Sequence, residues 1–196
     1  MFGFSLKEVR DLVIAALVLA FLFAYPFPAG CGSLECIGAR TAIFLLLVST
    51  SFLGHELSHR MVARHFGSYA EFQMWPSALV FAAGLRILIP GFPVFAAPGA
   101  VMFSPFSKKH LFVDTKEVGM IGLAGPLANV ARALLFYFLL PGDLGATGAY
   151  INLSLGMFNM WPIGPLDGAK VFKWSMPIWG LAFLSMFLFL WGLGGL

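Results

Sequence analysis

The stretch TAIFLLLVSTSFLGHELSHRMVARHF (Thr41–Phe66) is apolar for most of its length and carries ionisable side chains toward its end. A transmembrane helix needs about 20 predominantly apolar residues, so this stretch is long enough to cross a bilayer. Within it, the pattern His-Glu-x-x-His runs from His55 to His59. Because ionisable groups are costly inside a membrane, their presence in such a helix indicates a functional site.

The composition of the whole chain favours a membrane protein. Of its 196 residues, 60% are hydrophobic and 11% are charged, whereas soluble domains are about 45–50% apolar and about 25% charged. So few charges argue against a soluble domain, a disordered chain and a nucleic-acid binder. We therefore expect one integral-membrane domain over residues 1–196, with the lipid bilayer as its partner and no nucleic acid.

Apolar runs along the chain predict five membrane spans. Lys and Arg residues flank alternate ends of these runs, which places the N-terminus and the end of the second span in the cytoplasm. Arg40, at an outer end, and Arg132, inside the third span, are exceptions. The first run could also be a signal peptide, and residues 141–148 are expected to form an external turn. The five runs are Leu12–Tyr25, Thr41–Phe66, Val118–Leu140, Ala149–Trp161 and Pro177–Leu193.

Residues 67–116, between the second and third spans, do not have a helical pattern. Proline and glycine interrupt apolar pieces that are too short to span, such as Arg86–Ile89 and Val94–Ala97. Short apolar pieces between such residues predict strands and hairpins. Since lipid does not tolerate an open sheet, this segment is expected at the interface or around a protein-lined cavity.

The His-Glu-x-x-His pattern predicts a metal site. On a helix, His55 and His59 lie one turn apart on one face and can bind a single zinc ion. Glu56 can then take a proton from water that the metal activates. The alternative is a pair of packed histidines beside an unrelated glutamate. His55 follows Thr41 by about 21 Å of helix, which places it in the cytoplasmic half of a core about 30 Å thick.

Two histidines leave a catalytic zinc one protein ligand short. Asp143 falls on the predicted outer turn, and Asp114 and Glu117 flank the third span. Asp167 follows the break in the fourth span at a depth that matches the histidines, within NMWPIGPLDG (Asn159–Gly168). Asp167 is therefore the expected third ligand; its alternative role is to cap the start of a helix.

The third span contains the sequence Gly125-Pro126-Leu127-Ala128-Asn129. Pro126 is expected to kink the helix. The amide of Asn129 either joins neighbouring helices or donates a hydrogen bond to a substrate carbonyl or developing oxyanion.

Cys31 and Cys36 lie between the first two apolar runs. They form a small disulfide loop if the segment faces an oxidising compartment, and otherwise remain two free thiols.

Together, the His55–His59 pattern, Gly125–Asn129 and the Asn159–Gly168 motif resemble the site-2 protease family of intramembrane zinc metalloproteases. The segment Pro98-Gly99-Ala100-Val101 also looks like the membrane-associated strands of that family. The motifs and their connections cover a catalytic core of about residues 40–175. The resemblance implies a minimal, archaeal-type member, in which six spans are common where we count five.

The resemblance implies one zinc ion per chain on His55, His59 and Asp167, with Glu56 as the general base and Asn129 assisting at the substrate carbonyl. The implied fold is an all-α polytopic membrane protein with about five to six transmembrane helices. This fold also includes a small membrane-associated β-sheet between the second and third transmembrane helices. The implied activity is hydrolysis of peptide bonds within or near the membrane-spanning segments of cell-membrane protein substrates, through a site that opens to the cytoplasm.

Two alternatives remain at this stage. A metal-ion transporter or channel could use the same His and Asp cluster, although transporters often carry repeated halves and this sequence has no repeat. One strand of the stretch Leu85–Phe103, which contains Pro98–Val101, is expected to pair with an unwound substrate by edge addition. The alternative is that this stretch only scaffolds or covers the cavity.

Overall fold

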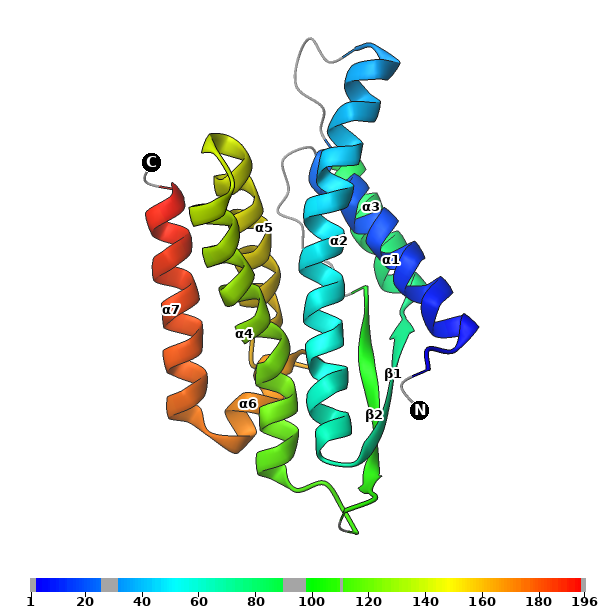
Figure 1. Cartoon of the computed structure of the whole chain (residues 1–196), viewed down its shortest axis with the longest axis vertical. Coiled ribbons are helices and arrows are strands. Elements are labelled where there is room, and N and C mark those ends of the chain that lie inside the picture. Colours follow the sequence, from blue (N-terminus) through cyan, green and yellow to red (C-terminus); the bar gives the residue numbers. More distant parts are fainter. Residues whose placement is uncertain (1–2, 26–31, 90–97, 110, 195–196) are drawn as a thin grey trace. The chain divides into compact units, whose positions relative to one another are not determined.

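The computed structural model describes residues 3–25, 32–89, 98–109 and 111–194. The chain is mostly helical and contains a small two-stranded antiparallel sheet of β1 and β2 (Figure 1). The elements are α1 (Leu6–Ala24), α2 (Leu34–His65), β1 (Ser68–Met74), α3 (Pro76–Leu88), β2 (Gly99–Ser107), α4 (Thr115–Leu139), α5 (Gly142–Asn159), α6 (Asp167–Trp174) and α7 (Met176–Gly194).

Within the described residues, three helices are long and apolar enough to cross a membrane: α2, α4 and α7. The chain is therefore consistent with a membrane protein, but the expected five to six spans are not confirmed. Helix α1 has four charged residues in its first turns, and α5 is rich in glycine and polar residues. Neither helix therefore has a full membrane-spanning length of apolar residues with few charges, as α2, α4 and α7 have.

The segment between α2 and α4 differs in part from the sequence prediction. Its sheet is confirmed, but Arg86–Ile89 is not a strand, because residues up to Leu88 belong to α3. Pro76 occupies the first turn of this helix, where a missing N–H costs nothing, and Gly84 is accommodated inside it. The expectation for Val94–Ala97 lies outside the described residues, as does Cys31 of the possible Cys31–Cys36 pair.

The chain divides into two compact units, and the first comprises Met1–Leu53 with Phe72–Ala100. Here α1 packs against α3, and two arginines donate to backbone carbonyls at the end of α1. Arg40 bonds to the carbonyl of Ala24 (3.0 Å), and Arg86 bonds to that of Tyr25 (2.9 Å). Cations at a helix C-terminus satisfy carbonyls that lack helical partners. This contact explains why Arg40 lies at the outer end of a predicted span, where the bias of Lys and Arg toward the cytoplasm predicts no cation.

The start of α1 covers one edge of β1 in the same unit. The carboxylate of Glu8 accepts from the backbone N–H of Phe72 (3.1 Å), and that of Asp11 accepts from Met74 (3.3 Å). Both carboxylates are buried. Because the other edge of β1 pairs with β2, both edges of β1 have partners at these residues.

The second unit comprises Gly54–Glu71 with Val101–Leu196. Helix α4 packs against α5 and α6, and both of these pack against α7; α4, α5 and α7 lie side by side (Figure 1). The unit's buried core is Ala133, Ala149, Leu153, Met160, Val171 and Met186. The predicted external turn at residues 141–148 is wrong, because α5 already begins at Gly142.

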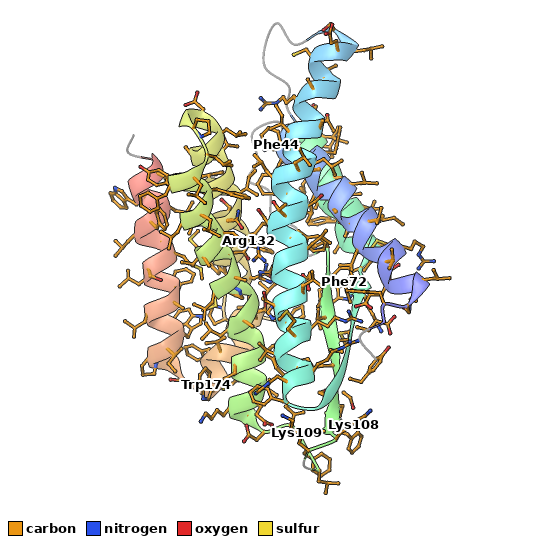
Figure 2. All side chains as sticks on the ribbon, in the orientation of Figure 1. Phe44, Phe72, Lys108, Lys109, Arg132 and Trp174 are labelled. Atoms are coloured by element: carbon orange, nitrogen blue, oxygen red, sulfur yellow. The ribbon has the colours of Figure 1, made fainter. Side chains whose placement is uncertain are left out.

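Close contacts between helices in the second unit depend on glycine. A methyl group at Gly119 of α4 would lie 2.4 Å from the Cβ atom of Trp174, and Trp174 lies at the end of α6 beside α4 (Figure 2).

At the end of α2, Gly67 has a φ of 80° and its N–H bonds to the carbonyl of Arg64 (2.9 Å). This left-handed glycine ends α2 and lets the chain turn into β1.

Candidate metal centre

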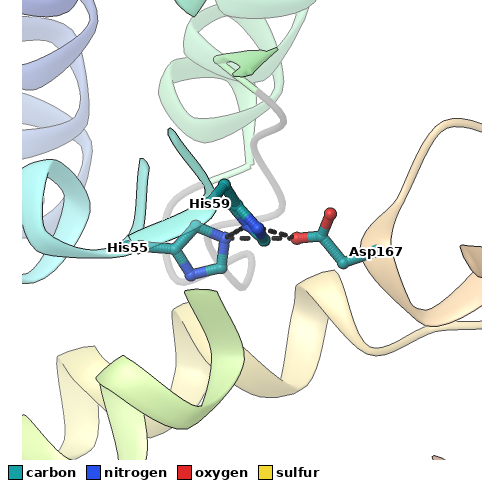
Figure 3. Close-up of side chains that lie close together, drawn as sticks. All are labelled: His55, His59 and Asp167. Carbon is teal, nitrogen blue, oxygen red and sulfur yellow. Dashed lines mark hydrogen bonds and ion pairs between the residues drawn. The ribbon is translucent and has the colours of Figure 1, made fainter. Parts of the chain in front are cut away.

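Three buried side chains of the second unit converge on one point (Figure 3). The Nε2 atom of His59 lies 2.9 Å from the Nε2 atom of His55 and 2.9 Å from an oxygen of Asp167. The Nε2 atom of His55 lies 3.2 Å from the same oxygen. Ligand atoms on a tetrahedral zinc with bonds of 2.0–2.1 Å are about 3.3 Å apart. The triangle is therefore close to the size that one zinc ion requires.

The outer nitrogens of both imidazoles bind acceptors. His59 Nδ1 donates to the backbone carbonyl of Ile121 (2.6 Å), and His55 Nδ1 donates to the amide oxygen of Asn129 (2.5 Å). A neutral imidazole has one N–H, so each Nε2 presents a lone pair to the other and to the Asp167 carboxylate. Three electron-pair donors that face one another require a cation, and such outer hydrogen bonds are typical of metal-binding histidines.

Gly125 of α4 leaves room for this cation. A methyl group on Gly125 would lie 2.3 Å from His59 Nε2 and 2.6 Å from His55 Nε2. The nearby Pro126 lies inside α4 and removes a helical N–H at this turn. The motif that contains Gly125 thus brings backbone, without a side chain, against the ligand atoms.

Asp167 is the first residue of α6, after the break that follows α5. It does not cap the helix, since Leu166 occupies the N-cap position and no side chain caps there. One oxygen of Asp167 faces the histidines, and the other accepts from Lys170 Nζ (2.9 Å). Gly168 permits this position, because a methyl group there would lie 2.1 Å from the carbonyl oxygen of Met160.

Glu56 is buried next to the first histidine in sequence. Its carboxylate accepts a hydrogen bond from the backbone N–H of Val101. Within the described part of the chain, its Oε2 atom has no hydrogen-bond partner. A buried carboxylate oxygen without a partner is unusual in a folded protein, and it suits a group that binds or deprotonates water.

The other acidic candidates lie away from the centre. Asp143 is exposed at the start of α5, about 24 Å of helix from Asn159, the last residue of α5. Asp114 and Glu117 form a capping box at the start of α4, in which each side chain accepts from the other's backbone N–H. None of them belongs to the cluster of His55, His59 and Asp167.

Asn129 is fully buried, and both ends of its amide are bonded. Its oxygen accepts from His55, and its nitrogen donates to the side-chain oxygen of Asn152 on α5 (3.1 Å). The expected role at a substrate carbonyl stays a prediction. The sequence analysis did not identify Asn152. The only sign of its importance in the sequence is that it is a polar residue within the apolar run of the predicted fourth span.

The predicted substrate strand Pro98–Val101 has two different environments. The carbonyl of Pro98 accepts from the N–H of Trp75 (2.9 Å), and a methyl group on Gly99 would lie 2.2 Å from the carbonyl oxygen of Gln73. Pro98 and Gly99 thus contact β1 and the residue after it. Val101, by contrast, donates to Glu56.

Arg132 lies on α4 (Figure 2), where its Nη1 atom donates to the carbonyl of Ala128 (3.0 Å). Its guanidinium occupies the space beside Gly54, where a methyl group would lie 2.0 Å from Cζ. Gly54 directly precedes His55, so Arg132 packs against the turn that carries the metal cluster.

The chain is similar to curated proteins whose names are provisional. The chain is 41% identical over 193 residues to the provisionally named zinc metalloprotease MJ0611 of Methanocaldococcus jannaschii, covering 94% of this chain and 93% of that protein. It is 30% identical over 138 residues to Rip3 of Mycobacterium tuberculosis, which is also provisionally named a zinc metalloprotease. The match covers 70% of this chain and 31% of Rip3.

A third relative, YwhC of Bacillus subtilis, is also provisionally named a zinc metalloprotease and is 26% identical over 157 residues, 68% of each chain. No family model and no solved structure matches the chain. The extent of the first similarity and the residues of the metal cluster lead to one conclusion. This chain belongs to the site-2 protease family of zinc metalloproteases.

Proposed function

We propose that the protein is an intramembrane endopeptidase that hydrolyses peptide bonds within or near the membrane-spanning segments of other membrane proteins. The observation that supports this most directly is the position of the metal cluster. His55 and His59 lie on α2, an apolar helix long enough to span a membrane, and Asp167 joins them from the break after α5. A peptide bond must therefore be presented to buried groups.

His55, His59 and Asp167 would hold one zinc ion, with the fourth position of a tetrahedral site left for water or substrate. Zinc held there supplies a Lewis acid that polarises a carbonyl and acidifies water. Glu56 acts as the general base: its carboxylate accepts the proton of the attacking water and returns it to the leaving amine. The buried, unpartnered Oε2 atom supports this role.

The substrate would be bound as an extended strand. A helical peptide bond is shielded by its own hydrogen bonds, so the substrate must unwind and find new partners for its N–H and C=O groups. The N–H groups of Phe72 and Met74 already bind Glu8 and Asp11, so of the two strands in the described part of the chain β2 is the one to accept the substrate. Val101 of β2 donates to Glu56, so a substrate paired near Val101 would lie close to the general base.

The test is cleavage of a membrane-spanning substrate by purified protein in lipid. We expect Glu56→Gln to keep one zinc per chain and to lose activity by roughly 10²–10⁴-fold, the usual contribution of a general base. Glu35→Gln is the matched control, because Glu35 is exposed near the start of the same helix. It should retain both zinc and activity, and a zinc chelator should abolish wild-type cleavage.

Other outcomes would contradict the proposal. If Glu56→Gln cleaves at the wild-type rate, Glu56 is not the base. If the zinc-loaded wild type cleaves no unfolded or membrane-spanning substrate but moves metal ions across vesicles, the cluster belongs to a transporter.

A further inference from the structure

A chain of hydrogen bonds joins α5, α4 and α2 behind the metal cluster. Asn152 Nδ2 donates to the backbone carbonyl of Gly148 (2.9 Å), and Asn152 Oδ1 accepts from Asn129 Nδ2 (3.1 Å). Asn129 Oδ1 then accepts from His55 Nδ1 (2.5 Å). Both asparagines are fully buried and His55 is 3% exposed. These groups belong to the second unit.

The direction of every bond in this chain follows from its first member. A carbonyl such as that of Gly148 can only accept, so Asn152 must turn its NH₂ group toward it. The oxygen of Asn152 then faces Asn129 and requires a donor, which turns the NH₂ group of Asn129 toward α5. The oxygen of Asn129 consequently faces His55, so His55 carries its proton on Nδ1 and leaves Nε2 free to bind a metal.

His59 obtains the same tautomer in a different way. Its Nδ1 atom donates to the carbonyl of Ile121, an acceptor that is fixed in the backbone of α4. The acceptor for His55 is a side-chain amide, which can turn over and present NH₂ instead of oxygen. In that orientation Asn129 would favour the proton on Nε2 of His55, and Nε2 could not bind zinc. His55 therefore needs a residue that prevents the flip.

We propose that Asn152 is this positioning residue: by binding Asn129, it holds His55 in the tautomer that binds zinc. Gly156 allows the approach, because a methyl group there would lie 3.2 Å from the Cβ atom of Asn129. The proposal rests on the zinc centre of the proposed function and does not depend on the substrate. The competing view is that Asn152 only joins two helices.

Zinc affinity, measured by competition with a chromophoric chelator, separates the two views. Asn152→Leu keeps the approximate size of the side chain but removes the acceptor, and we expect a roughly 10- to 100-fold loss of zinc affinity, as for other outer partners of metal ligands. Asn152→Asp keeps an oxygen for Asn129 and should remain within about 3-fold of wild type, on the scale of one neutral hydrogen bond.

Asn159→Leu is the matched control. Asn159 Nδ2 also donates to the carbonyl four residues earlier on α5, that of Leu155 (2.9 Å), so this variant removes the same kind of helix contact. It should keep wild-type zinc affinity. Nitrogen NMR of the metal-free protein gives a second readout: the His55 proton should be on Nδ1 in wild type and shift toward Nε2 in Asn152→Leu.

The outcomes are distinct for the two proposals. Equal zinc affinity in wild type and Asn152→Leu, with an unchanged His55 tautomer, would overturn the role of Asn152 and leave the protease proposal intact. Equal losses in Asn152→Leu and Asn152→Asp would also overturn it, because an oxygen at this position would then give no rescue. A wild-type protein that binds no zinc would overturn the metal centre itself.

Discussion

At the scale of single residues, the metal centre depends as much on a missing side chain as on the ligands. Gly125→Ala would place a carbon atom 2.3 Å from His59 Nε2 and 2.6 Å from His55 Nε2, in space that the cation needs. We expect this variant to bind little or no zinc, as measured by metal content after purification. Gly180→Ala is the control, because a methyl group there meets no atom within 4 Å; full zinc content in Gly125→Ala would contradict this account.

The sequence predicted the residues of the cluster and singled out Asn129, but it did not predict Asn152 behind them. His55, His59 and Asp167 could be found because their type, spacing and depth are constrained by the metal. Asn152 could not, since its importance comes from the direction of hydrogen bonds between helices that are distant in sequence. The same holds for Arg40, whose partner is a backbone carbonyl of α1.

At the scale of elements, the alternation of β2 indicates where a substrate could pair. The carbonyl of Pro98 accepts from the N–H of Trp75, so the backbone groups of Pro98 face the edge that pairs with β1. Along a strand, the backbone groups of successive residues point alternately to the two edges. Val101 and Phe103 therefore point away from β1. Pro105 also lies on this outer edge, where its missing N–H leaves the pairing with β1 intact, and its carbonyl accepts from Val113 (2.9 Å).

Phe103→Pro therefore tests pairing of the substrate with β2. It removes one outward N–H, so we expect zinc content to stay at one per chain and cleavage to fall roughly 2- to 10-fold, the contribution of about one hydrogen bond. Phe103→Ala controls for the lost ring and keeps the N–H. If the two variants cleave equally, β2 does not pair with the substrate at Phe103 and the covering role is favoured.

The prediction of elements succeeded where apolar sequence was uninterrupted. Helices α4 and α7 were expected close to their observed bounds, and α2 close to its observed end, although α2 begins at Leu34 and not at Thr41. Helix α3 was mistaken for strand because Gly84 and the prolines after it resemble strand boundaries, whereas packing against α1 stabilises a helix there. The start of α5 was missed because its glycines resemble a turn. Gly145 in fact lets α5 approach the end of α4 closely, because a methyl group there would lie 2.7 Å from the carbonyl oxygen of Phe136.

At the scale of the whole molecule, orientation in the membrane follows from charge. Lys108 and Lys109 lie at the end of β2 (Figure 2), ahead of α4, and Asp143 lies just beyond the other end of α4. The excess of Lys and Arg on cytoplasmic loops predicts that Lys109 faces the cytoplasm and Asp143 the opposite side. Helix α4 is about 37 Å long, enough to separate the two across a bilayer.

Cysteine labelling in intact cells measures this orientation. In a background where Cys31 and Cys36 are replaced by serine, we expect Asp143→Cys to react with an impermeant thiol reagent. Lys109→Cys should react only after the membrane is permeabilised. The reverse pattern would mean that the metal centre opens to the outside.

The distance along the chain between the ligands has a consequence for biosynthesis. Asp167 follows His55 by 112 residues, and the carbonyl of Met160 before it is held by the indole N–H of Trp179 on α7 (2.7 Å). A ribosome therefore makes α1 to α5 before the third ligand exists. Helix α7, which bonds to the carbonyl of Met160, is made later still. A nascent chain that ends after α4 carries both histidines and Glu56 but lacks the third ligand. Hydrolysis that depends on the complete zinc site therefore could not begin before α6 has been made.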